Sequence, residues 1–556
     1  MAFEILLGLV ALATAASASP TATLDGRQAD RCVAATFTGS PTWPSSIASI
    51  RYGPELRHAP GSNLPYCYVE VSVRPAGSSS VFAFGLGLPD APAWAANAHR
   101  FLAVGNGAYF PNITWTDLVY GTARGFATVS TDTGHAEYVR DDLNLTWAED
   151  RDKLADFAHR ALDFSVDIAK SMARGFYQRD LGRAYYMGCS TGGRQGLKQV
   201  QDRPDAFDGV LIGAPAWDHK HYLPWVAKVG SWQVSRPAAD RLNETWQFDL
   251  LYQLSVRTCD TTTVPNDPRD SIIMRPEACH PPVDDLLCKN GQAPPTCLLP
   301  SHVEIAKLMY GNYTIDGRLF FPGALLPGSE RGWTVFTSLV ALNFFDTQYQ
   351  LHFLDRTDPL NPTNPPIDWN VYEDRIGLVS ERQDPGNVTA DRLAAMAAYR
   401  ARGGKIIMYH GLADAVIPPG SSDDLYVRTR AALAGSGGGD VADFFRYFKV
   451  PAMGHCVLSE PNGQAPWWLG GANQNPENVL LVPDVPYYTK ETNALLALID
   501  WVEGGGGGGG SRGPSQIITS TPISLTPPQR PVCLFDRRAE YKGGDVNNST
   551  SWVCPA

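Results

Sequence analysis

The sequence predicts an α/β fold in which a mostly parallel sheet is covered by helices and interrupted by one large insertion. In the first half of the chain, short apolar runs bounded by turns alternate with segments of helical periodicity. This alternation stops near Trp217, where Pro and aromatic residues become frequent, and it returns near Thr389. The chain has 556 residues, more than one core usually holds, so a further domain is expected within it.

The first part of the chain carries most of the expected strands. Apolar runs that end at turn residues predict strands within residues 66–75, 80–89, 99–110, 125–135 and 207–216. Residues 150–178 have apolar side chains at helical spacing and predict a helix. Residues 183–201 predict a strand, a sharp turn and a second helix.

The last part of the chain resumes the same pattern. Residues 389–404 predict a helix with Gly403 at its end, residues 405–411 a buried strand, and residues 492–504 a helix. A run of seven glycines, Gly504 to Gly510, follows and is interpreted as a flexible spacer. The tail after it contains Cys533 and Cys554, so we expect it to dock back on the domain.

The predicted domain boundaries follow from these shifts in composition. We expect a signal peptide at 1–18, a catalytic α/β domain in two parts at 19–216 and 391–556, and an inserted lid at 217–390.

The N-terminus has the pattern of a secretion signal. Ile5 to Ala16 is an apolar run of suitable length, and Ala16-Ser17-Ala18 is a small-x-small cleavage signal. Glu4 departs from the pattern because the segment before the apolar run carries no Lys or Arg. A buried core helix is the alternative, but Thr, Ser and Pro follow at once. No later run is long and apolar enough to span a membrane, so a secreted, extracellular protein is expected.

Charge and cysteine content support this interpretation. The net charge is −11 and no long Lys/Arg cluster occurs, which argues against nucleic acid or an anionic membrane as partners. Ten cysteines, an even number, fit an oxidising compartment. Seven Asn-x-Ser/Thr sequons are expected glycosylation sites: Asn112, Asn144, Asn243, Asn312, Asn387, Asn547 and Asn548.

The segment Gly188-Cys189-Ser190-Thr191-Gly192 matches the G-x-S-x-G pattern between an expected strand and an expected helix. In such a turn the backbone is strained and the residues two positions away must be small, so that the serine hydroxyl stands clear. The pattern is common by chance, but its place between strand and helix favours Ser190 as a nucleophile in an α/β-hydrolase fold.

The expected order of a hydrolase triad is Ser, then Asp or Glu, then His. Of the eleven histidines, only His455 follows position 410, and it lies in a Gly-flanked turn after an apolar strand. Asp414 lies in the loop after the buried strand at 405–411 and is the expected acid. Asp423 and Asp424 are less favoured because they fall in the next helical stretch, and His410 is interpreted as a structural histidine.

A cysteine stands beside both expected catalytic residues, Cys189 before Ser190 and Cys456 after His455. A disulfide between them would hold the base within reach of the nucleophile. It would close a loop of more than 250 residues, which stabilises a protein by up to roughly 5 kcal/mol. The alternative is a pair of unrelated buried thiols.

Cys-Ser, Asp and His-Cys in this order resemble the secreted tannase and feruloyl esterase family. The segments GCSTGGRQGLKQVQ, FDGVLIGAPA, GFATVSTDTGH, HGLADAVIPP and MGHC are similar to its members over nearly the whole mature chain. The CSTGGRQG form looks more like the feruloyl esterase B branch than like tannases. The resemblance implies an α/β-hydrolase with a large lid inserted after the nucleophile helix.

The resemblance also implies how the other cysteines pair. The implied disulfides are Cys32–Cys67, Cys259–Cys279, Cys288–Cys297 and Cys533–Cys554.

Family members bind calcium in a lid loop similar to the one that begins at Cys259. The ligands implied in this chain are Thr263, Asn266, Pro268, Asp270 and Ile272. Calcium needs several hard oxygen ligands, and this loop lacks two of the family's carboxylates, although Asp260 or Asp267 could substitute. The alternative is a proline-rich loop closed by its disulfide without metal.

The parts together predict a serine esterase mechanism that needs no cofactor. Ser190 attacks the ester, His455 moves the proton and Asp414 orients the imidazole. By resemblance, the oxyanion is held by the N–H of Thr191 and by one from the Gly105-Asn106-Gly107 turn, Gly107 being the expected donor. The alternative for that segment is a plain turn at a strand end.

The substrate is the least determined feature. The lid holds aromatic residues that can line a pocket for a phenolic acid, although a lid core is the more frequent role for any one of them: Trp217, Trp225, Trp232, Trp333, Phe344 and Phe345. A feruloyl esterase that acts on phenolic-acid esters of plant cell walls is the first interpretation. A tannase acting on galloyl esters is the second, and a non-catalytic binding protein of hydrolase fold is the third. The Cys-Ser and His-Cys pairs argue against a serine carboxypeptidase.

Overall fold

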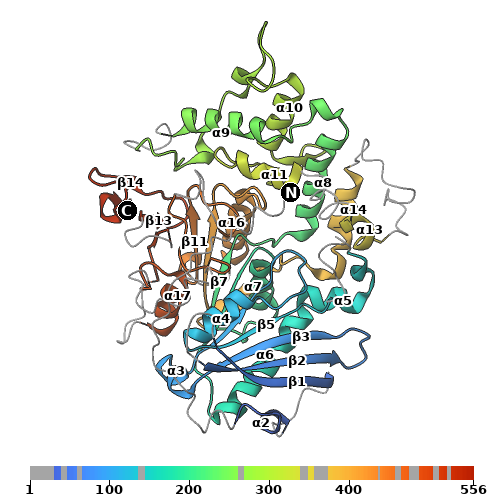
Figure 1. The fold of residues 1–556 in the computed structure, drawn as a ribbon, viewed down its shortest axis with the longest axis vertical. Helices are drawn as coiled ribbons and strands as arrows, with labels where there is room; N and C mark the ends of the chain where they lie inside the picture. The colour runs from blue at the N-terminus through green and yellow to red at the C-terminus, as the bar shows by residue number, and fades with distance from the viewer. Residues whose placement is uncertain are drawn as a thin grey trace, which may run out of the picture.

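The computed structural model has one large mixed sheet at its centre (Figure 1). It describes residues 31–38, 47–58, 65–135, 145–260, 268–337, 348–355, 374–435, 439–457, 465–474, 488–504, 513–521 and 528–555. The sheet has nine strands in the order β1-β2-β3-β5-β4-β6-β7-β10-β11. The neighbours β1–β2, β2–β3 and β3–β5 pair antiparallel. The neighbours β5–β4, β4–β6, β6–β7, β7–β10 and β10–β11 pair parallel. The expected α/β class is confirmed.

The strands of this sheet are short except at the antiparallel edge. Their bounds are Ile47–His58 (β1), Pro65–Pro75 (β2), Phe82–Pro89 (β3), Phe101–Val104 (β4), Ala127–Thr131 (β5), Ala184–Cys189 (β6), Gly209–Gly213 (β7), Lys405–Gly411 (β10) and Phe445–Val450 (β11).

Helices cover both faces of the sheet, because the central strands are buried on both sides. One face packs against α6 (Ala161–Tyr177), α7 (Thr191–Asp202), α15 (Met396–Ala401) and α16 (Pro419–Leu433). The other packs against α4 (Trp115–Ala123) and α17 (Ala494–Glu503). In β6, Tyr186 belongs to the first cluster and its neighbours Tyr185 and Met187 to the second, as the alternation of a strand requires.

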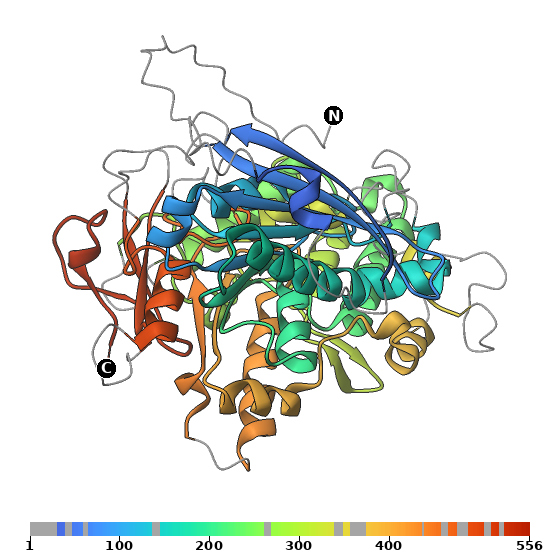
Figure 2. The same ribbon diagram turned by 90° about the horizontal axis from the view of Figure 1, so that it is seen from below.

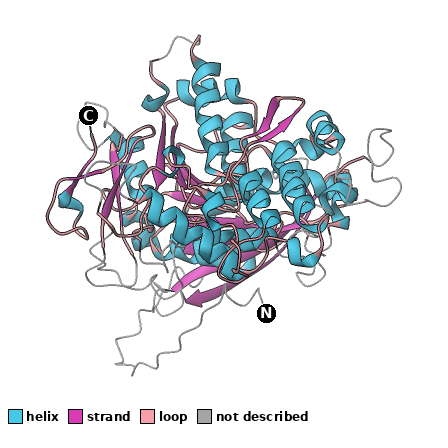
Figure 3. Ribbon diagram, turned by 90° about the horizontal axis from the view of Figure 1, so that it is seen from above, coloured by secondary structure: helices cyan, strands magenta, loops and turns pink. Residues whose placement is uncertain are grey.

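The segment between β7 and β10 is mainly helical and lies at one end of the molecule (Figure 1). Seen from that end, its helices lie in front of the sheet (Figure 3). Its elements are α8 (His219–Val234), α9 (Thr245–Cys259), α10 (Pro300–Met309), α11 (Thr334–Thr337), α13 (Gln348–His352), α14 (Arg375–Gln383) and the hairpin β8–β9 (Tyr313–Ile315, Arg318–Phe321). They share an apolar core that includes Trp225, Trp333 and Phe321.

The C-terminal segment, red in Figures 1 and 2, lies beside β11 and α17. It contains two small antiparallel pairs, β12–β13 (Gln516–Thr519, Arg530–Cys533) and β14–β15 (Glu540–Tyr541, Trp552–Val553). The main chain of Phe535 donates to Tyr447 of β11, so the tail extends the domain at its parallel edge.

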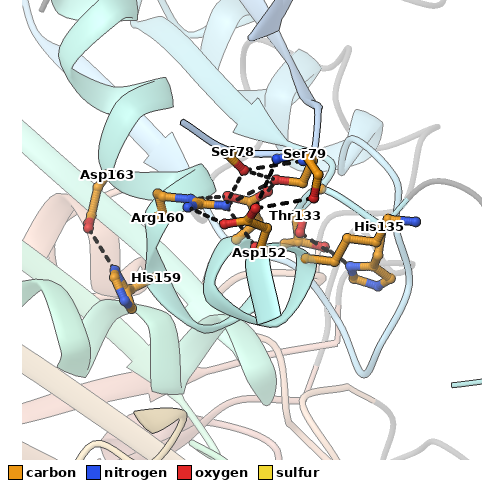
Figure 4. Close-up of polar contacts among 12 residues, drawn as sticks. Ser78, Ser79, Thr133, His135, Asp152, His159, Arg160 and Asp163 are labelled. Carbon is orange, nitrogen blue, oxygen red and sulfur yellow. Dashed lines mark hydrogen bonds and ion pairs between the residues drawn. The ribbon is translucent and has the colours of Figure 1, made fainter. Parts of the chain in front are cut away.

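A polar network ties the β2–β3 turn to the helical segment before α6 (Figure 4). Arg160 donates to Asp156 at 2.5 Å and to Asp152 at 3.1 Å, and it also contacts the hydroxyls of Ser78 and Ser80. The Ser79 N–H donates to Asp152 at 2.9 Å. Asp156 to Arg160 form a π-helical segment, so the helix expected at 150–178 is continuous in sequence but irregular in its middle.

Most elements expected from the sequence are present with shifted bounds. The helix expected at 389–404 is shorter, with a 3-10 turn (Leu393–Ala395) before α15. The strand β1 was not expected. It is an edge strand whose residues 47–58 include Pro54 and mixed polar residues, so it lacks a clear apolar pattern.

Candidate active site

Ser190 stands at the junction of β6 and α7 in a strained backbone conformation. Its φ is 63° and its ψ −122°, which is unusual for a residue other than glycine. A Cβ atom at Gly188 would lie 2.6 Å from the main chain of Gly192, so this close turn requires glycine. The turn therefore has the local geometry of a nucleophile elbow.

Asp414 and His455 are in contact after the ends of β10 and β11. The Nδ1 atom of His455 lies 2.8 Å from Oδ2 of Asp414. The other carboxylate oxygen, Oδ1, accepts from the N–H groups of Val416 at 2.8 Å and Ile417 at 2.9 Å. Asp414 is fully buried, whereas the His455 side chain is 22% exposed. The Asp414 carboxylate is thus held in place, and the His455 side chain is accessible to solvent.

The electrostatics keep Asp414 ionised. Burial alone would raise the pKa of Asp414, but the nearby His455 and hydrogen bonds from His410 and His455 lower it well below its ordinary value. An ionised Asp414 is suited to orient an imidazole and to stabilise its protonated form.

His410 is a contact of Asp414 that sequence reasoning missed. Its Nε2 lies 3.2 Å from Oδ2 of Asp414 and 2.9 Å from the carbonyl of Ile417, and its Nδ1 lies 2.7 Å from the Ser422 hydroxyl. A carbonyl only accepts, so Nε2 carries a proton and can donate toward the carboxylate as well. The sequence signal for this contact is that His410 lies at the end of the predicted strand, four residues before Asp414.

A disulfide joins Cys189 to Cys456, with 6.0 Å between their Cα atoms. It therefore links the residue before Ser190 to the residue after His455. Within the described residues the Ser190 hydroxyl makes no hydrogen bond. A long nucleophile–base contact is common before substrate binds, so the missing hydrogen bond does not argue against the expected roles of Ser190 and His455.

The other cysteines form four further disulfides. These are Cys32–Cys67, Cys259–Cys279, Cys288–Cys297 and Cys533–Cys554, the pairs that the resemblance implies.

The expected oxyanion turn lies against the nucleophile helix. The Thr191 hydroxyl donates to the carbonyl of Ala108 at 2.8 Å, and a Cβ at Gly105 would lie 2.6 Å from Cα of Gly192. The N–H of Ser190 donates to Gly213 and that of Gly105 to Met187, so neither is available. In the part of the chain that the structure describes, no protein acceptor is assigned to the N–H of Gly107 or Thr191. These two donors are therefore available to a ligand oxygen.

The described part of the expected calcium loop gives no support for a calcium site. Thr263 and Asn266 lie outside the described residues. Asp270 accepts from the Arg530 guanidinium at 2.5 Å and from the Ile272 N–H at 3.1 Å, and the Pro268 carbonyl accepts from the Asp270 N–H. The described residues contain no group of three or more His, Cys, Asp or Glu side chains that could hold a metal ion. Arg530 thus supplies the positive charge for the carboxylate that was expected to bind calcium.

The expected aromatic lid residues are mostly core residues. Trp217 is fully buried on the sheet side and donates to the Ser421 carbonyl of α16. Trp225 and Trp333 are buried in the core of the inserted segment, with Trp232 packed on its margin. Phe344 and Phe345 lie outside the described residues.

Six of the seven sequon asparagines are exposed: Asn112, Asn243, Asn312, Asn387, Asn547 and Asn548. Asn144 and the expected signal peptide lie outside the described residues, as does the glycine run after Gly504. Glycosylation stays a prediction. None of the helices in the described part of the chain has the length and hydropathy that a membrane crossing requires.

Comparison with known proteins gives consistent results. The family model described as tannase and feruloyl esterase matches residues 67–555. A probable feruloyl esterase B-2 of Aspergillus terreus is 30% identical over 465 residues, which cover 82% of this chain and 80% of that protein. The crystal structure of feruloyl esterase B from Aspergillus oryzae has a TM-score of 0.76 at 26% identity, covering 92% of this chain and 98% of that one. A tannin acyl hydrolase from Aspergillus niger has a TM-score of 0.72 at 19% identity, covering 97% and 96%, and supports the α/β-hydrolase fold alone.

Proposed function

The chain belongs to the tannase and feruloyl esterase family of carboxylic ester hydrolases, and from this premise we propose that it is a secreted feruloyl esterase. In this proposal it releases ferulic and related hydroxycinnamic acids from plant cell-wall esters. The observation that carries the mechanism is the 2.8 Å contact between His455 and Asp414, together with the disulfide that links the neighbours of Ser190 and His455.

The proposed reaction is a two-step acyl transfer. The Ser190 Oγ atom attacks the ester carbonyl carbon while Nε2 of His455 takes the hydroxyl proton. The tetrahedral oxyanion accepts from the N–H groups of Thr191 and Gly107. His455 returns the proton to the leaving alcohol, and an acyl-enzyme remains on Ser190. A water molecule, deprotonated by His455, then releases the phenolic acid.

The inserted residues 217–390 act as the lid in this proposal, between the two parts of the catalytic domain at 19–216 and 391–556. The support is that Tyr109, which follows the oxyanion turn, and Ala415 and Ile417, which follow Asp414, share one apolar cluster with residues of the insertion such as Trp225. A lid with this contact would cover the ester site and supply the wall of an acyl pocket.

The feruloyl assignment rests on the relatives, since the residues of the site serve any ester. The feruloyl esterases are the more similar relatives at 26–30% identity, whereas the tannin acyl hydrolase is at 19%. A tannase remains the second candidate. Secretion is supported by five disulfides and by exposed sequons, and N-terminal sequencing of the exported protein should begin after Ala18.

The test is hydrolysis of methyl ferulate, methyl caffeate and methyl gallate by the secreted protein, with Ser190→Ala as the control. We expect turnover of the two cinnamates and its loss, by roughly 10⁴-fold or more, in the folded variant. Turnover of gallate alone would transfer the assignment to tannase with the mechanism intact. Undiminished activity of Ser190→Ala would overturn the mechanism, and a lack of turnover of all three esters would favour the non-catalytic alternative.

A further inference from the structure

We propose that Gln195 is a positioning residue that fixes the oxyanion turn against the nucleophile helix, and this inference rests on the proposed esterase function. Gln195 lies on α7, four residues after Thr191, so both side chains occupy the same face of the helix. Both contact the turn that follows β4: Thr191 binds the Ala108 carbonyl, and Gln195 binds Asn106.

The Gln195 amide makes two hydrogen bonds to the same residue. The Asn106 N–H donates to Oε1 of Gln195 at 3.0 Å, and Nε2 of Gln195 donates to Oδ1 of Asn106 at 3.2 Å. Both side chains are 2% exposed. Because a main-chain N–H only donates, the Gln195 amide has one possible orientation here, and its geometry is fixed.

Asn106 passes this constraint to the surrounding main chain. Its Nδ2 donates to the carbonyls of Thr131 at 2.7 Å and Asn112 at 3.0 Å. The Asn106 amide therefore joins the oxyanion turn to the end of β5 and to the loop before α4. The main-chain N–H and the side-chain amide of Asn106 are both bound within the protein, so the Asn106 side chain is held in one orientation.

This pairing also determines which N–H groups of the turn already have an acceptor within the protein. The N–H groups of Gly105 and Asn106 are both bonded inside the protein, the second of them to Gln195. Gly107 is the next residue, and its N–H is the first in the turn with no acceptor among the residues that the structure describes. If Gln195 no longer held Asn106, the Asn106 N–H would need a new acceptor and the Gly107 N–H would lose its fixed direction. An oxyanion donor contributes to catalysis only when it is already aimed at the transition state.

The same helix offers a matched control. Gln201 is 3% exposed, and its amide also makes two hydrogen bonds, from Nε2 to the Ala390 carbonyl at 2.8 Å and from the Arg392 N–H to Oε1 at 3.1 Å. These bonds tie α7 to the segment before α15, away from the oxyanion turn. Gln195 also accepts a longer bond from the Tyr186 hydroxyl at 3.4 Å, so Gln195→Met removes three hydrogen bonds of α7 and Gln201→Met removes two.

The experiment measures kcat, KM and Tm for both variants on methyl ferulate, or on whichever methyl ester the native protein hydrolyses. For Gln195→Met we expect kcat to fall about 10- to 100-fold with KM within about twofold of the native value. For Gln201→Met we expect a similar loss of Tm with kcat nearly unchanged. Equal effects of the two variants on kcat would overturn the proposal, because they would show a structural role alone.

A second readout covers the case in which Gln195→Met does not fold. Gln195→Glu keeps the size of the side chain and the acceptor for the Asn106 N–H but replaces the donor to Oδ1. Binding of phenylboronic acid, which forms a tetrahedral adduct with a nucleophilic serine, should weaken in Gln195→Glu by the same factor as kcat/KM. Inhibition by free ferulate should change little. Unchanged boronic acid binding by Gln195→Glu would overturn the inference. If the native protein itself hydrolysed none of the test esters, that result would instead contradict the proposed function.

Discussion

Cys189 and Cys456 are bonded to each other across a sequence separation of 267 residues, and each is adjacent to a proposed catalytic residue. The bond closes the longest of the five disulfide loops. It joins the end of β6 to the loop after β11, and the whole inserted segment lies between these two places in the sequence. We therefore expect the bond to affect both stability and the approach of His455 to Ser190.

The double variant Cys189→Ala/Cys456→Ala should lose both activity and stability. Removing a link over such a loop lowers the free energy of unfolding by up to about 5 kcal/mol in the chain-entropy model. We expect kcat/KM for methyl ferulate to fall at least about tenfold at a temperature where the variant is still folded, because the Ser190–His455 approach is no longer held. Activity and thermal melting are the measurements.

Cys288→Ala/Cys297→Ala is the control, since it opens a loop with a separation of only 9 residues within the inserted segment. It should lower Tm less and leave kcat nearly unchanged. Full activity of the Cys189/Cys456 variant would show that the link has no catalytic role.

Asp414→Asn should remove most of the activity while the fold is retained. The amide has nearly the same shape, but it cannot stabilise a protonated His455 and need not hold the required tautomer, so kcat should fall by roughly 10³- to 10⁴-fold. Because the pKa of Asp414 lies below its ordinary value, the carboxylate contributes stability above about pH 4 that is lost as pH falls. The variant should therefore also have a lower Tm at neutral pH, with a smaller difference in acid.

His410→Gln tests the second histidine on the same carboxylate. Its Nε2 shares Oδ2 of Asp414 with His455, so its removal should lower kcat much less than Asp414→Asn does, by about tenfold. Equal losses in His410→Gln and Asp414→Asn, with equal Tm, would mean that His410 takes a more direct part than its position implies.

The sequence predicts Ser190, Asp414 and His455 as candidate catalytic residues from short motifs and from their order along the chain. Ser190 is marked by the glycines around it, and His455 and Asp414 by their order after it. The contacts that hold these groups could not be predicted in the same way. Gln195 meets Asn106 across 89 residues, and His410 meets Asp414 only because the turn after β10 folds back on the strand end.

The calcium expectation finds no support among the described residues, for a similar reason. The neighbours of Asp270 in the sequence suggest a metal loop, whereas its partner Arg530 is 260 residues away on β13. A tertiary ion pair of this kind leaves no periodic or local pattern. The strand β1 was not predicted because it lies at the edge of the sheet and pairs with β2 on one side. The amino-acid composition of an edge strand is less restricted than that of a central strand.

Asp132→Asn should stabilise the protein at neutral pH and have little effect in acid. Asp132 is 8% exposed, and burial raises its pKa to about 7, against the effect of two N–H donors, Ala83 and Gly134. The folded state then keeps a proton that the unfolded chain loses near pH 4, so stability falls as pH rises from about 4 to 7. Asparagine cannot lose that proton, and the gain in Tm over the native protein should grow across this window.

Asp152→Asn is the contrasting control. The N–H of Ser79 lowers the pKa of Asp152 in the folded state, so this carboxylate stabilises the protein above about pH 4. Its replacement should lower Tm at neutral pH, if only slightly, because the group is near the surface. Melting curves at about pH 4.5, 6 and 8 separate the two cases, and a pH-independent gain in Asp132→Asn would contradict the raised pKa.

Arg530 should take the stabilising role that calcium has been expected to play in the loop between Cys259 and Cys279. The guanidinium is 5% exposed, stacks over Trp552 at 4.1 Å and donates to Asp270. Arg530→Met would leave the Asp270 carboxylate, whose side chain is 20% exposed, without its cationic partner, which costs on the order of 1–3 kcal/mol. We expect a clear fall in Tm together with earlier proteolysis of the 260–279 loop.

Removal of divalent cations gives the complementary result. Because Arg530 already neutralises Asp270, EDTA should leave the Tm and the esterase activity of the native protein unchanged, and added calcium should not raise either. Arg537→Met, which removes an exposed arginine of the same tail, is the control and should be nearly neutral. A large loss of Tm in EDTA that calcium restores, with Arg530→Met unaffected, would show that the loop depends on metal rather than on the guanidinium.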